Sequence, residues 1–440
     1  MKKKIFLLLI ILFSKSAFLY LQSGWIPQQS GTTVKLNKVF FINSQTGWVV
    51  GDSGKIIKTI NGGINWVFKN SNVNQTLRSV YFLNETTGYA VGGNYIPLIH
   101  TPDNIKIILK TTDGGNTWIV KYFSQGFYNS LSDVAFVNEV FGFATSFGGN
   151  ESKSTTSIFK TIDSGENWYE FGFESSIISI QFTNQNMGYL ASNYYSDVFG
   201  DSLFIFKTSN SGSNWYKIYS LPKGMLYSSN FINNNTGWAA GLTRISGFNR
   251  DLILKTTDGG LNWQNFALAS FSTINAIYFA SYDNGWYCNS GIFKSIDGGE
   301  SWINQVPSNG NDYYTSIIFI DNKTGWAVGN NGKILKTITG GVTSINPSNG
   351  IIPDNFSLNQ NYPNPFNPTT NINFSIPKSS FVTLKVYNVI GKEIADLINE
   401  NLNAGVYSFD FNADGLATGV YLYKLIAGDY SAIKKMTVLK

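Results

Sequence analysis

The fold is decided by the stretch Lys110-Thr111-Thr112-Asp113-Gly114-Gly115-Asn116-Thr117-Trp118, because versions of it recur along most of the chain. Each version carries a Lys-Thr or Lys-Ser pair, a Gly-bearing turn and, in six of the seven, a closing Trp. The pairs are 39 to 52 residues apart and begin at Lys58, Lys110, Lys160, Lys207, Lys255, Lys294 and Lys336. A repeat of this period is typical of solenoids and propellers.

A second signature has the same number of copies. A Gly followed by an aromatic residue occurs at Gly47, Gly88, Gly142, Gly188, Gly237, Gly285 and Gly325. The segment before each alternates between apolar and polar residues, as at Val80/Phe82. Such alternation between Asn/Gly turns predicts strands. Each repeat is therefore expected to form four short strands, for example an inner strand at 77–82, strands at 88–91 and 107–110, and an outer strand from 118.

Four strands every 40 to 50 residues or so match a propeller blade, and seven blades close a ring. We therefore predict an all-β chain: a seven-bladed β-propeller at residues 24–341, followed by a small C-terminal β-sandwich. The seventh repeat has no closing Trp, but Trp25 is followed by the pattern that follows the other Trp residues. We expect Trp25 to begin the outer strand of the seventh blade, which would join both ends of the propeller in one sheet and remove exposed edges.

The N-terminal residues predict export. Lys2, Lys3 and Lys4 precede the apolar run Ile5–Phe13, so residues 1–23 resemble a secretory signal peptide. Nine apolar residues are too few to span a bilayer, and no integral membrane span is expected after their removal. Without the four Lys of this segment, the formal charge falls from +5 to +1. The near-neutral remainder gives no support to a nucleic-acid partner.

The turns of the repeat carry a second resemblance. Their Asp or Asn side chains can accept backbone hydrogen bonds, and their Gly residues allow positive φ. These structural turn positions are Asn61, Asp113, Asp163, Asn210, Asp258 and Asp297. They resemble the Asp-box (BNR) repeat of sialidases and related propellers. Combined with Thr324-Gly325-Trp326-Ala327-Val328-Gly329, they look most like the photosystem II stability/assembly factor-like propellers. The resemblance implies the fold and says little about function.

The C-terminal part resembles an export signal. Residues 342–355 are predicted to be a polar linker, and residues 356–440 form the sandwich. The block Asn361-Tyr362-Pro363-Asn364-Pro365-Phe366-Asn367-Pro368, the Tyr387–Gly391 turn and Lys434-Lys435-Met436 together resemble the type A sorting domain of the type IX secretion system. This implies the type IX machinery as a partner. It also implies secretion from, or attachment to the outer surface of, a Gram-negative-type bacterium. A generic carbohydrate-binding sandwich is the alternative for this segment.

Candidate binding residues come from enlarged loops. All Trp residues occupy repeat positions, so the aromatic content does not by itself indicate a glycan cleft. Blades two to five have long connections between their second and third strands, at 94–104, 148–157, 193–202 and 242–251. Loops on one face of a rigid scaffold commonly bind ligands, although neutral surface variation is the alternative. The predicted ligand-binding residues in or near these loops are Arg78, Arg244, Arg250, Tyr95, Tyr194 and Tyr195.

We expect a non-catalytic binding or scaffolding propeller that recognises a protein or glycan. No catalytic residue is assigned, because a sialidase needs an arginine cluster and this chain has three Arg, two of them in one loop. The alternative is a polysaccharide-active glycoside hydrolase with two facing carboxylates, drawn from Asp133, Asp197, Asp201 and Asp251. One Cys and one His predict no metal site and no cofactor. Cys288 is expected to be a buried apolar residue and His100 a surface residue.

Overall fold

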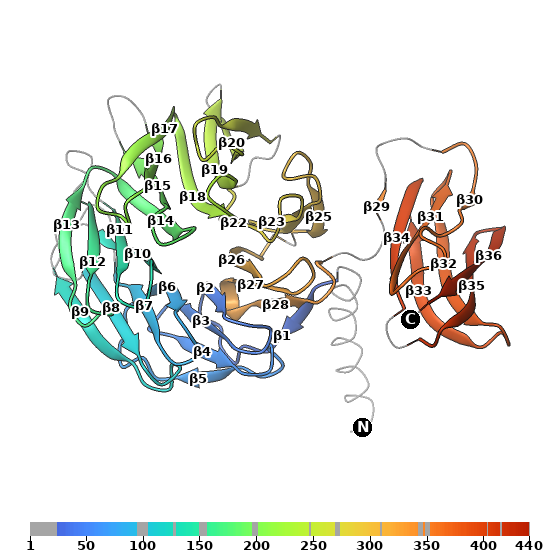
Figure 1. The fold of residues 1–440 in the computed structure, drawn as a ribbon, viewed down its shortest axis with the longest axis horizontal. Coiled ribbons are helices and arrows are strands. Elements are labelled where there is room, and N and C mark those ends of the chain that lie inside the picture. The colour runs from blue at the N-terminus through green and yellow to red at the C-terminus, as the bar shows by residue number, and fades with distance from the viewer. Residues whose placement is uncertain are drawn as a thin grey trace, which may run out of the picture. The chain divides into compact units, whose positions relative to one another are not determined.

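Figure 1 shows the computed structural model, which describes residues 24–94, 104–125, 129–148, 156–195, 201–245, 248–268, 273–308, 310–341, 346–347, 353–402, 404–413 and 416–439. The predicted signal peptide, Tyr95 and His100 lie outside these residues. The chain divides into two compact units, Met1–Gly341 and Val342–Lys440. Within the described ranges the elements are strands and one short 3-10 helix, η1 (Asn330–Gly332). The same ranges contain no helix long and apolar enough to cross a membrane.

The first unit contains seven four-stranded sheets. Blades 1 to 3 are formed by β2 (Leu36–Phe41), β3 (Gly47–Gly51), β4 (Ile56–Thr59) and β5 (Val67–Lys69); by β6 (Leu77–Phe82), β7 (Gly88–Gly92), β8 (Ile105–Thr111) and β9 (Ile119–Gln125); and by β10 (Asn129–Phe136), β11 (Gly142–Gly148), β12 (Thr156–Thr161) and β13 (Tyr169–Phe173). Blades 4 and 5 are formed by β14 (Ser176–Phe182), β15 (Gly188–Tyr194), β16 (Ser202–Thr208) and β17 (Tyr216–Pro222); and by β18 (Gly224–Phe231), β19 (Gly237–Ile245), β20 (Phe248–Thr256) and β21 (Gln264–Ala267). Blades 6 and 7 are formed by β22 (Ala276–Phe279), β23 (Gly285–Cys288), β24 (Ile292–Ser295) and β25 (Ile303–Val306); and by β26 (Tyr314–Phe319), β27 (Gly325–Gly329), β28 (Ile334–Thr337) and β1 (Ile26–Gln28).

The blades form a ring around a centre lined by their first strands, as Figure 1 shows for β2, β6, β10, β14, β18, β22 and β26. Strands β3, β7 and β27 are buried at every residue, because each is covered by the neighbouring blades. The outer strands β5, β9 and β13 are largely exposed. The seven-bladed propeller predicted from the repeat is confirmed.

The ring is closed by the N-terminal strand. β1 pairs antiparallel with β28, with Ile26 opposite Lys336 and Gln28 opposite Ile334. Trp25 is fully buried and packs edge-on against Phe319 of β26, with ring centroids 5.8 Å apart. The prediction that Trp25 leads into the outer strand of the seventh blade is correct. The closure therefore places the N-terminal strand in the same sheet as the last three strands of the propeller.

The Asp-box turns share one hydrogen-bond pattern. In blade 2, the Thr111 hydroxyl donates to Asp113 Oδ1 at 2.8 Å and accepts from Gly115 N at 2.8 Å. Asp113 Oδ1 also accepts from Thr117 N at 2.9 Å. Blades 1, 3, 4, 5 and 6 repeat the pattern around Asn61, Asp163, Asn210, Asp258 and Asp297. The repeated residues therefore hold the turn together.

Each turn also joins two blades. In blade 1, Trp48 Nε1 donates to Gly114 O in the turn of blade 2, at 3.0 Å. This close approach requires glycine, because a Cβ at Gly115 would lie 2.9 Å from the same indole nitrogen. The repeated lysine stands over the aromatic ring of its own blade, with Lys58 Nζ 5.2 Å from the ring of Trp48. The pairing of lysine and ring recurs in all seven blades.

The acidic turns predict a loss of stability in acid. Hydrogen bonds to each ionised carboxylate, from Thr117 to Asp113 and from Asn167 to Asp163, lower the pKa of both to about 2. An Asp whose pKa is depressed by folding adds stability above its unfolded pKa of about 4, and that stability is lost as the pH falls through the folded value. We expect the urea concentration at which half of the propeller is unfolded to decrease as the pH is lowered from about 4 to about 2. Asp113→Asn together with Asp163→Asn should flatten this decline, and an unchanged slope would contradict the role of these turns.

The second unit is a sandwich of two four-stranded sheets, ordered β29-β34-β31-β30 and β33-β32-β35-β36. Its strands are β29 (Asn346–Pro347), β30 (Ser357–Leu358), β31 (Thr369–Ile376), β32 (Ser380–Asn388), β33 (Glu393–Leu402), β34 (Gly405–Asn412), β35 (Gly419–Ala427) and β36 (Tyr430–Val438). The Pro-rich block is part of its core: Phe366 is buried, and buried Asn361 donates to Thr370 Oγ1 at 2.9 Å. The predicted C-terminal β-sandwich is confirmed.

Candidate recognition site at the propeller mouth

The inner strands share one irregularity that shapes the centre of the ring. Six of them contain a β-bulge at the same place, where one extra residue interrupts the register with the second strand. In blade 2, for example, Leu77 lies opposite Gly92 and Ser79 opposite Val91, which leaves Arg78 unpaired. Bulges bend a strand and redirect a side chain. The bulge lies at the start of the inner strand, at the end of the blade where the second strand finishes.

The bulged residues form a ring around the centre. Together with Asn275, which precedes β22 in blade 6, they line one cavity of about 390 Å³. We call them the mouth ring: Asn37, Arg78, Ser132, Ile178, Tyr227, Asn275 and Thr315. Each blade contributes one residue at an equivalent position, so the seven side chains can be compared directly with one another.

Four members of the mouth ring fasten one blade to the next. Asn37 Nδ2 donates to Leu77 O at 3.0 Å, and Ser132 Oγ donates to Ile177 O at 2.7 Å. Asn275 Nδ2 reaches Tyr314 O at 2.7 Å, and Thr315 Oγ1 reaches Leu36 O at 2.5 Å. Each acceptor belongs to the residue just before the next blade's bulge or its equivalent. These four side chains therefore have a structural role.

The other three members, Arg78, Ile178 and Tyr227, make no such hydrogen bond to a main-chain carbonyl of the next blade within the described residues, although Arg78 does contact blade 3. The guanidinium of Arg78 stands 4.8 Å from the ring of Phe147, and its Nε lies 3.5 Å from Ser130 Oγ. Burial lowers the pKa of Arg78, and the negative charge of Asp52 opposes this effect. Burial likewise raises the pKa of Tyr227. A cation, an aliphatic group and a phenol at partly exposed positions give the mouth a donor, an apolar contact and an aromatic contact.

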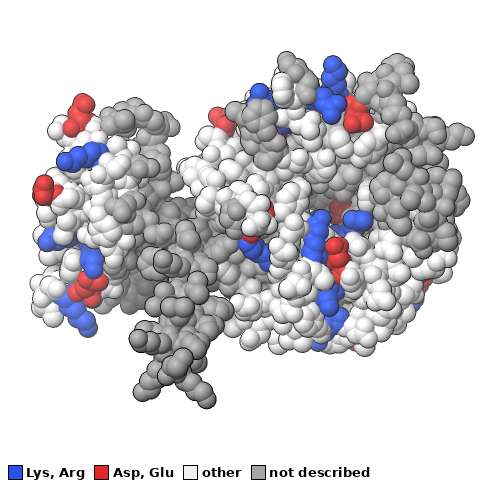
Figure 2. Space-filling model, turned by 180° about the vertical axis from the view of Figure 1, so that it is seen from behind, with Lys and Arg blue, Asp and Glu red and all other residues white. Residues whose placement is uncertain are grey.

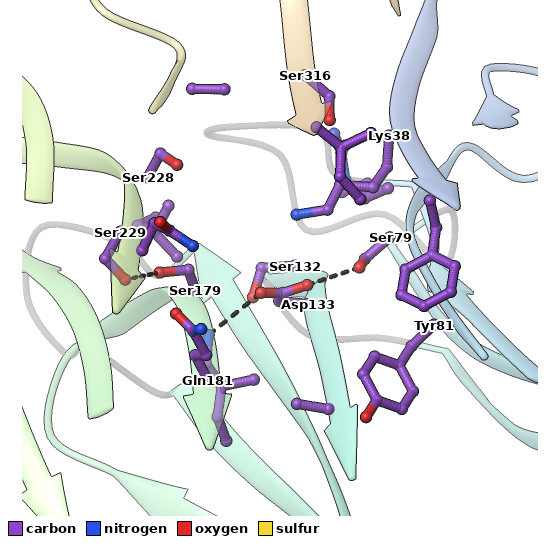
Figure 3. Close-up of a pocket in the computed structure, with 18 of the residues that line it drawn as sticks. Lys38, Ser79, Tyr81, Ser132, Asp133, Ser179, Gln181, Ser228, Ser229 and Ser316 are labelled. Carbon is purple, nitrogen blue, oxygen red and sulfur yellow. Dashed lines mark hydrogen bonds between the residues drawn. The ribbon is translucent and has the colours of Figure 1, made fainter. Parts of the chain in front are cut away.

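Several other polar groups that line this cavity, which we call the channel, bind one another. Figure 3 shows Asp133 between Ser79 and the strand that carries Gln181. Asp133 Oδ1 accepts from Ser79 Oγ at 2.6 Å, and Oδ2 accepts from Ile180 N at 3.2 Å. Ser179 and Ser229 are joined at 2.7 Å. These bonds connect blades 2 to 5, and they engage both oxygens of the Asp133 carboxylate.

Of the carboxylates weighed for glycoside hydrolysis, those that the structure describes do not form a pair at this site. Asp133 is the single acidic residue among the described lining of the channel. Asp251 was expected in a loop but is fully buried in β20. The pKa of the neighbouring Tyr287 is raised first by burial and second by the negative charge of Asp251. Asp201 does not line the channel, and Asp197 lies outside the described residues. The described chain also has no cluster of three or more His, Cys, Asp or Glu suited to a metal ion.

The structure separates the binding residues that we predicted. Arg78 lines the channel, whereas Arg244 and Arg250 lie on the hairpin of β19 and β20 and do not line it. Arg244 is exposed, with Nε 3.5 Å from Asn249 Oδ1. Tyr194 ends β15, is 40% exposed and is followed by Tyr195, and neither lines the channel. Ile178 and Tyr227, which the loop argument missed, are the residues that accompany Arg78.

One of the predicted loops is a strand extension. Residues 242–251 were expected to form a loop, but β19 and β20 pair as far as Ile245 and Phe248. The added residues continue the ladder, because pairing satisfies their backbone groups. The connection at 193–202 is partly paired in the same way, since Tyr194 lies opposite Ser202. Much of the 94–104 and 148–157 connections lies outside the described residues.

The surface carries both signs of charge. Figure 2 shows basic side chains interspersed with acidic ones on a face that is mostly uncharged.

Cys288 is fully buried in β23, and burial raises its pKa. A thiol in this state is a poor nucleophile.

Comparison with known proteins matches the two parts of the chain separately. Residues 19–168 match the family model of the photosynthesis system II assembly factor YCF48, and residues 360–439 match that of the secretion system C-terminal sorting domain. No curated protein matches the chain. The sorting domain marks proteins exported by type IX secretion to the cell surface or outside, and this chain carries it.

Solved propellers confirm the fold. The structure of YCF48 bound to a D1 peptide is 20% identical, with a TM-score of 0.54, and the match covers 72% of this chain and 97% of that chain. YCF48 from Cyanidioschyzon merolae is 16% identical, with a TM-score of 0.51, and the match covers 71% of this chain and 98% of that chain. A polysaccharide lyase of family PL25, an ulvan lyase, is 11% identical with a TM-score of 0.49, and the match covers 71% of this chain and 95% of that chain. At these identities the likeness extends to the fold alone.

Proposed function

We propose that this chain is an exported, non-catalytic recognition module that binds a protein segment or glycan at the mouth of its propeller. The observation that carries the proposal is the mouth ring, in which four side chains donate to a main-chain carbonyl of the next blade, whereas Arg78, Ile178 and Tyr227 do not. A repeat needs no variation for its own packing, so departures at one lined cavity favour a role in binding.

The chemistry of the mouth favours an anionic ligand with an apolar part. Arg78 can donate two parallel hydrogen bonds to a carboxylate, sulfate or phosphate. Ile178 and Tyr227 would contact the apolar part. A YCF48 propeller has been solved with a D1 peptide, which makes peptides reasonable ligands to test. The charge of Arg78 favours acidic peptides, beside acidic glycans.

A catalytic role as a glycoside hydrolase is the second candidate and has less support. Hydrolysis of that kind uses two carboxyl groups roughly 5–10 Å apart. The described lining of the channel offers Asp133, whose oxygens both accept hydrogen bonds from the protein. We therefore expect retention of ligands without turnover.

The test is a binding and turnover screen of the secreted chain. The protein is immobilised and exposed to a panel of acidic peptides and acidic or neutral glycans, and both retention and release of products are scored. For a retained ligand, Arg78→Gln and Tyr227→Ala should each weaken binding about tenfold or more. The matched control is Arg244→Gln, which alters an exposed arginine outside the channel and should leave affinity unchanged. Equal losses at Arg78 and Arg244, or product release from a glycan, would contradict the proposal.

A further inference from the structure

One of the seven blade interfaces departs from the repeat. At the other six, a Trp or Tyr on the second strand donates from its polar tip to the next blade, as Trp238 Nε1 does to Gly298 O at 3.0 Å and Tyr89 OH does to Ser164 O at 2.6 Å. The remaining four donors follow the same rule. Between blades 3 and 4 the position is Phe143, which has no donor. The outer part of this interface is open.

A cavity of about 390 Å³ occupies the opening. Phe143 forms its inner end, Phe171 and Phe173 of β13 form one wall, and Trp215 forms part of the other. The ring of Phe171 is 55% exposed, so it presents an apolar face to solvent. The cavity shares no lining residue with the mouth.

Lys160 supplies a positive charge to this cavity. Its Nζ stands 5.7 Å from the ring of Phe143, and the described residues give it no hydrogen bond or ion pair. At the preceding interface the equivalent Lys110 is fully engaged, with Ser164 O at 2.7 Å and Glu166 Oε1 at 2.6 Å. Lys160 therefore has unused donors in a cavity that is lined in part by aromatic rings.

We propose that this cavity binds one acidic sugar residue, a hexuronate, of an extracellular polysaccharide. The flat C–H face of the sugar packs against the aromatic wall, and its carboxylate binds the ammonium group of Lys160. The volume lies within the range of small-ligand pockets, and aromatic walls with one polar anchor are typical of them. Four of the nine lining residues are aromatic, which suits a ring-shaped ligand, whereas an extended peptide is recognised mainly through its backbone. The positive charge selects the acidic sugar over a neutral one.

The probes are short oligomers of galacturonate, glucuronate and mannuronate, with methyl-esterified oligogalacturonate as the uncharged control. Binding to the full chain is measured by calorimetry. At least one acid oligomer should bind, and its methyl ester should bind at least about tenfold more weakly. Lys160→Met keeps the aliphatic stem, removes the charge and should weaken binding about tenfold. Phe171→Ala removes an exposed ring and should have a similar effect without disturbing the core.

Matched variants separate the site from the rest of the molecule. Lys58→Met changes the equivalent lysine of blade 1, which also stands over an aromatic ring, and should leave uronate binding intact. Phe143→Tyr restores the hydroxyl of the repeat and should raise the melting temperature while it lowers uronate affinity. Because acidic glycans are also candidate ligands of the mouth, uronate binding that is lost with Arg78→Gln and kept with Lys160→Met would assign the ligand to the mouth and overturn this proposal without affecting the other. Absence of binding to all three acid oligomers, preference for an acidic peptide, or equal losses with Lys58→Met and Lys160→Met would overturn the assignment.

Discussion

Replacing Trp326 with Ala is expected to lower the free energy of unfolding of the propeller by about 3–5 kcal/mol. Trp326 is fully buried at the junction of the last and first blades. Its ring stacks on Phe41 with centroids 3.5 Å apart, and its Nε1 donates to Gly62 O at 3.2 Å. The substitution removes a large side chain from a packed interface and leaves a cavity. Urea denaturation followed by tryptophan fluorescence measures the loss.

The control for this prediction is Trp326→Tyr. Tyr89 and Tyr189 occupy the equivalent position in blades 2 and 4 and stack on the next blade in the same manner. The tyrosine variant keeps a ring and a donor and should cost less than about 1.5 kcal/mol. If Trp326→Ala cost less than about 1 kcal/mol, closure of the ring would not depend on this contact.

Deleting residues 356–440 is expected to abolish delivery of the protein outside the cell. These residues include the match to the sorting domain, at 360–439, and they form most of a compact unit with its own core. The propeller has a separate set of cores between its blades, so it should fold without the sandwich. Immunoblots of cell and medium fractions should find the truncated protein inside the outer membrane and the full chain at the surface or in the medium.

Two control proteins show whether the sorting domain itself directs export. Asp133→Asn changes a buried residue of the channel and leaves the sorting domain intact, so its delivery should match that of the full chain. A reporter protein that carries the N-terminal 23 residues and residues 342–440 should be delivered outside. Delivery of the truncated propeller at the level of the full chain would contradict the sorting assignment.

The sequence was sufficient for the fold because the repeat fixes both local structure and packing. The Lys-Thr pair, the acidic turn and the Trp each recur at a position where the structure uses them between blades. The missing Trp of the seventh repeat and the presence of Trp25 were enough to predict the closing strand. The lysine was used only as a marker of the repeat, and its contact with the ring was not foreseen.

The site was less accessible from the sequence because its positions depend on register. A strict alternation was read into the inner strands, but their apolar residues are spaced by three and then by two, as in Leu77, Val80 and Phe82. That spacing indicates a bulge, and it would have identified Ile178 and Tyr227. The long connections pointed to Arg78, which lies near the mouth, and equally to Arg244, because a hairpin extension and a loop have similar lengths in the sequence. The neighbour of each bulged side chain lies in another blade, so a contact such as Ser132 to Ile177 O depends on the closed ring.

The most direct test of recognition at the mouth is photo-crosslinking of the exported chain on living cells. A diazirine amino acid is placed at Ile178, at Tyr227, or at Ile303, which is 37% exposed on the outer strand β25. Adducts formed on irradiation are identified by mass spectrometry. The account predicts the same light-dependent adduct from positions 178 and 227, its absence from position 303, and its loss when Arg78→Gln is added. Adducts of equal yield from all three positions, or from position 303 alone, would contradict it.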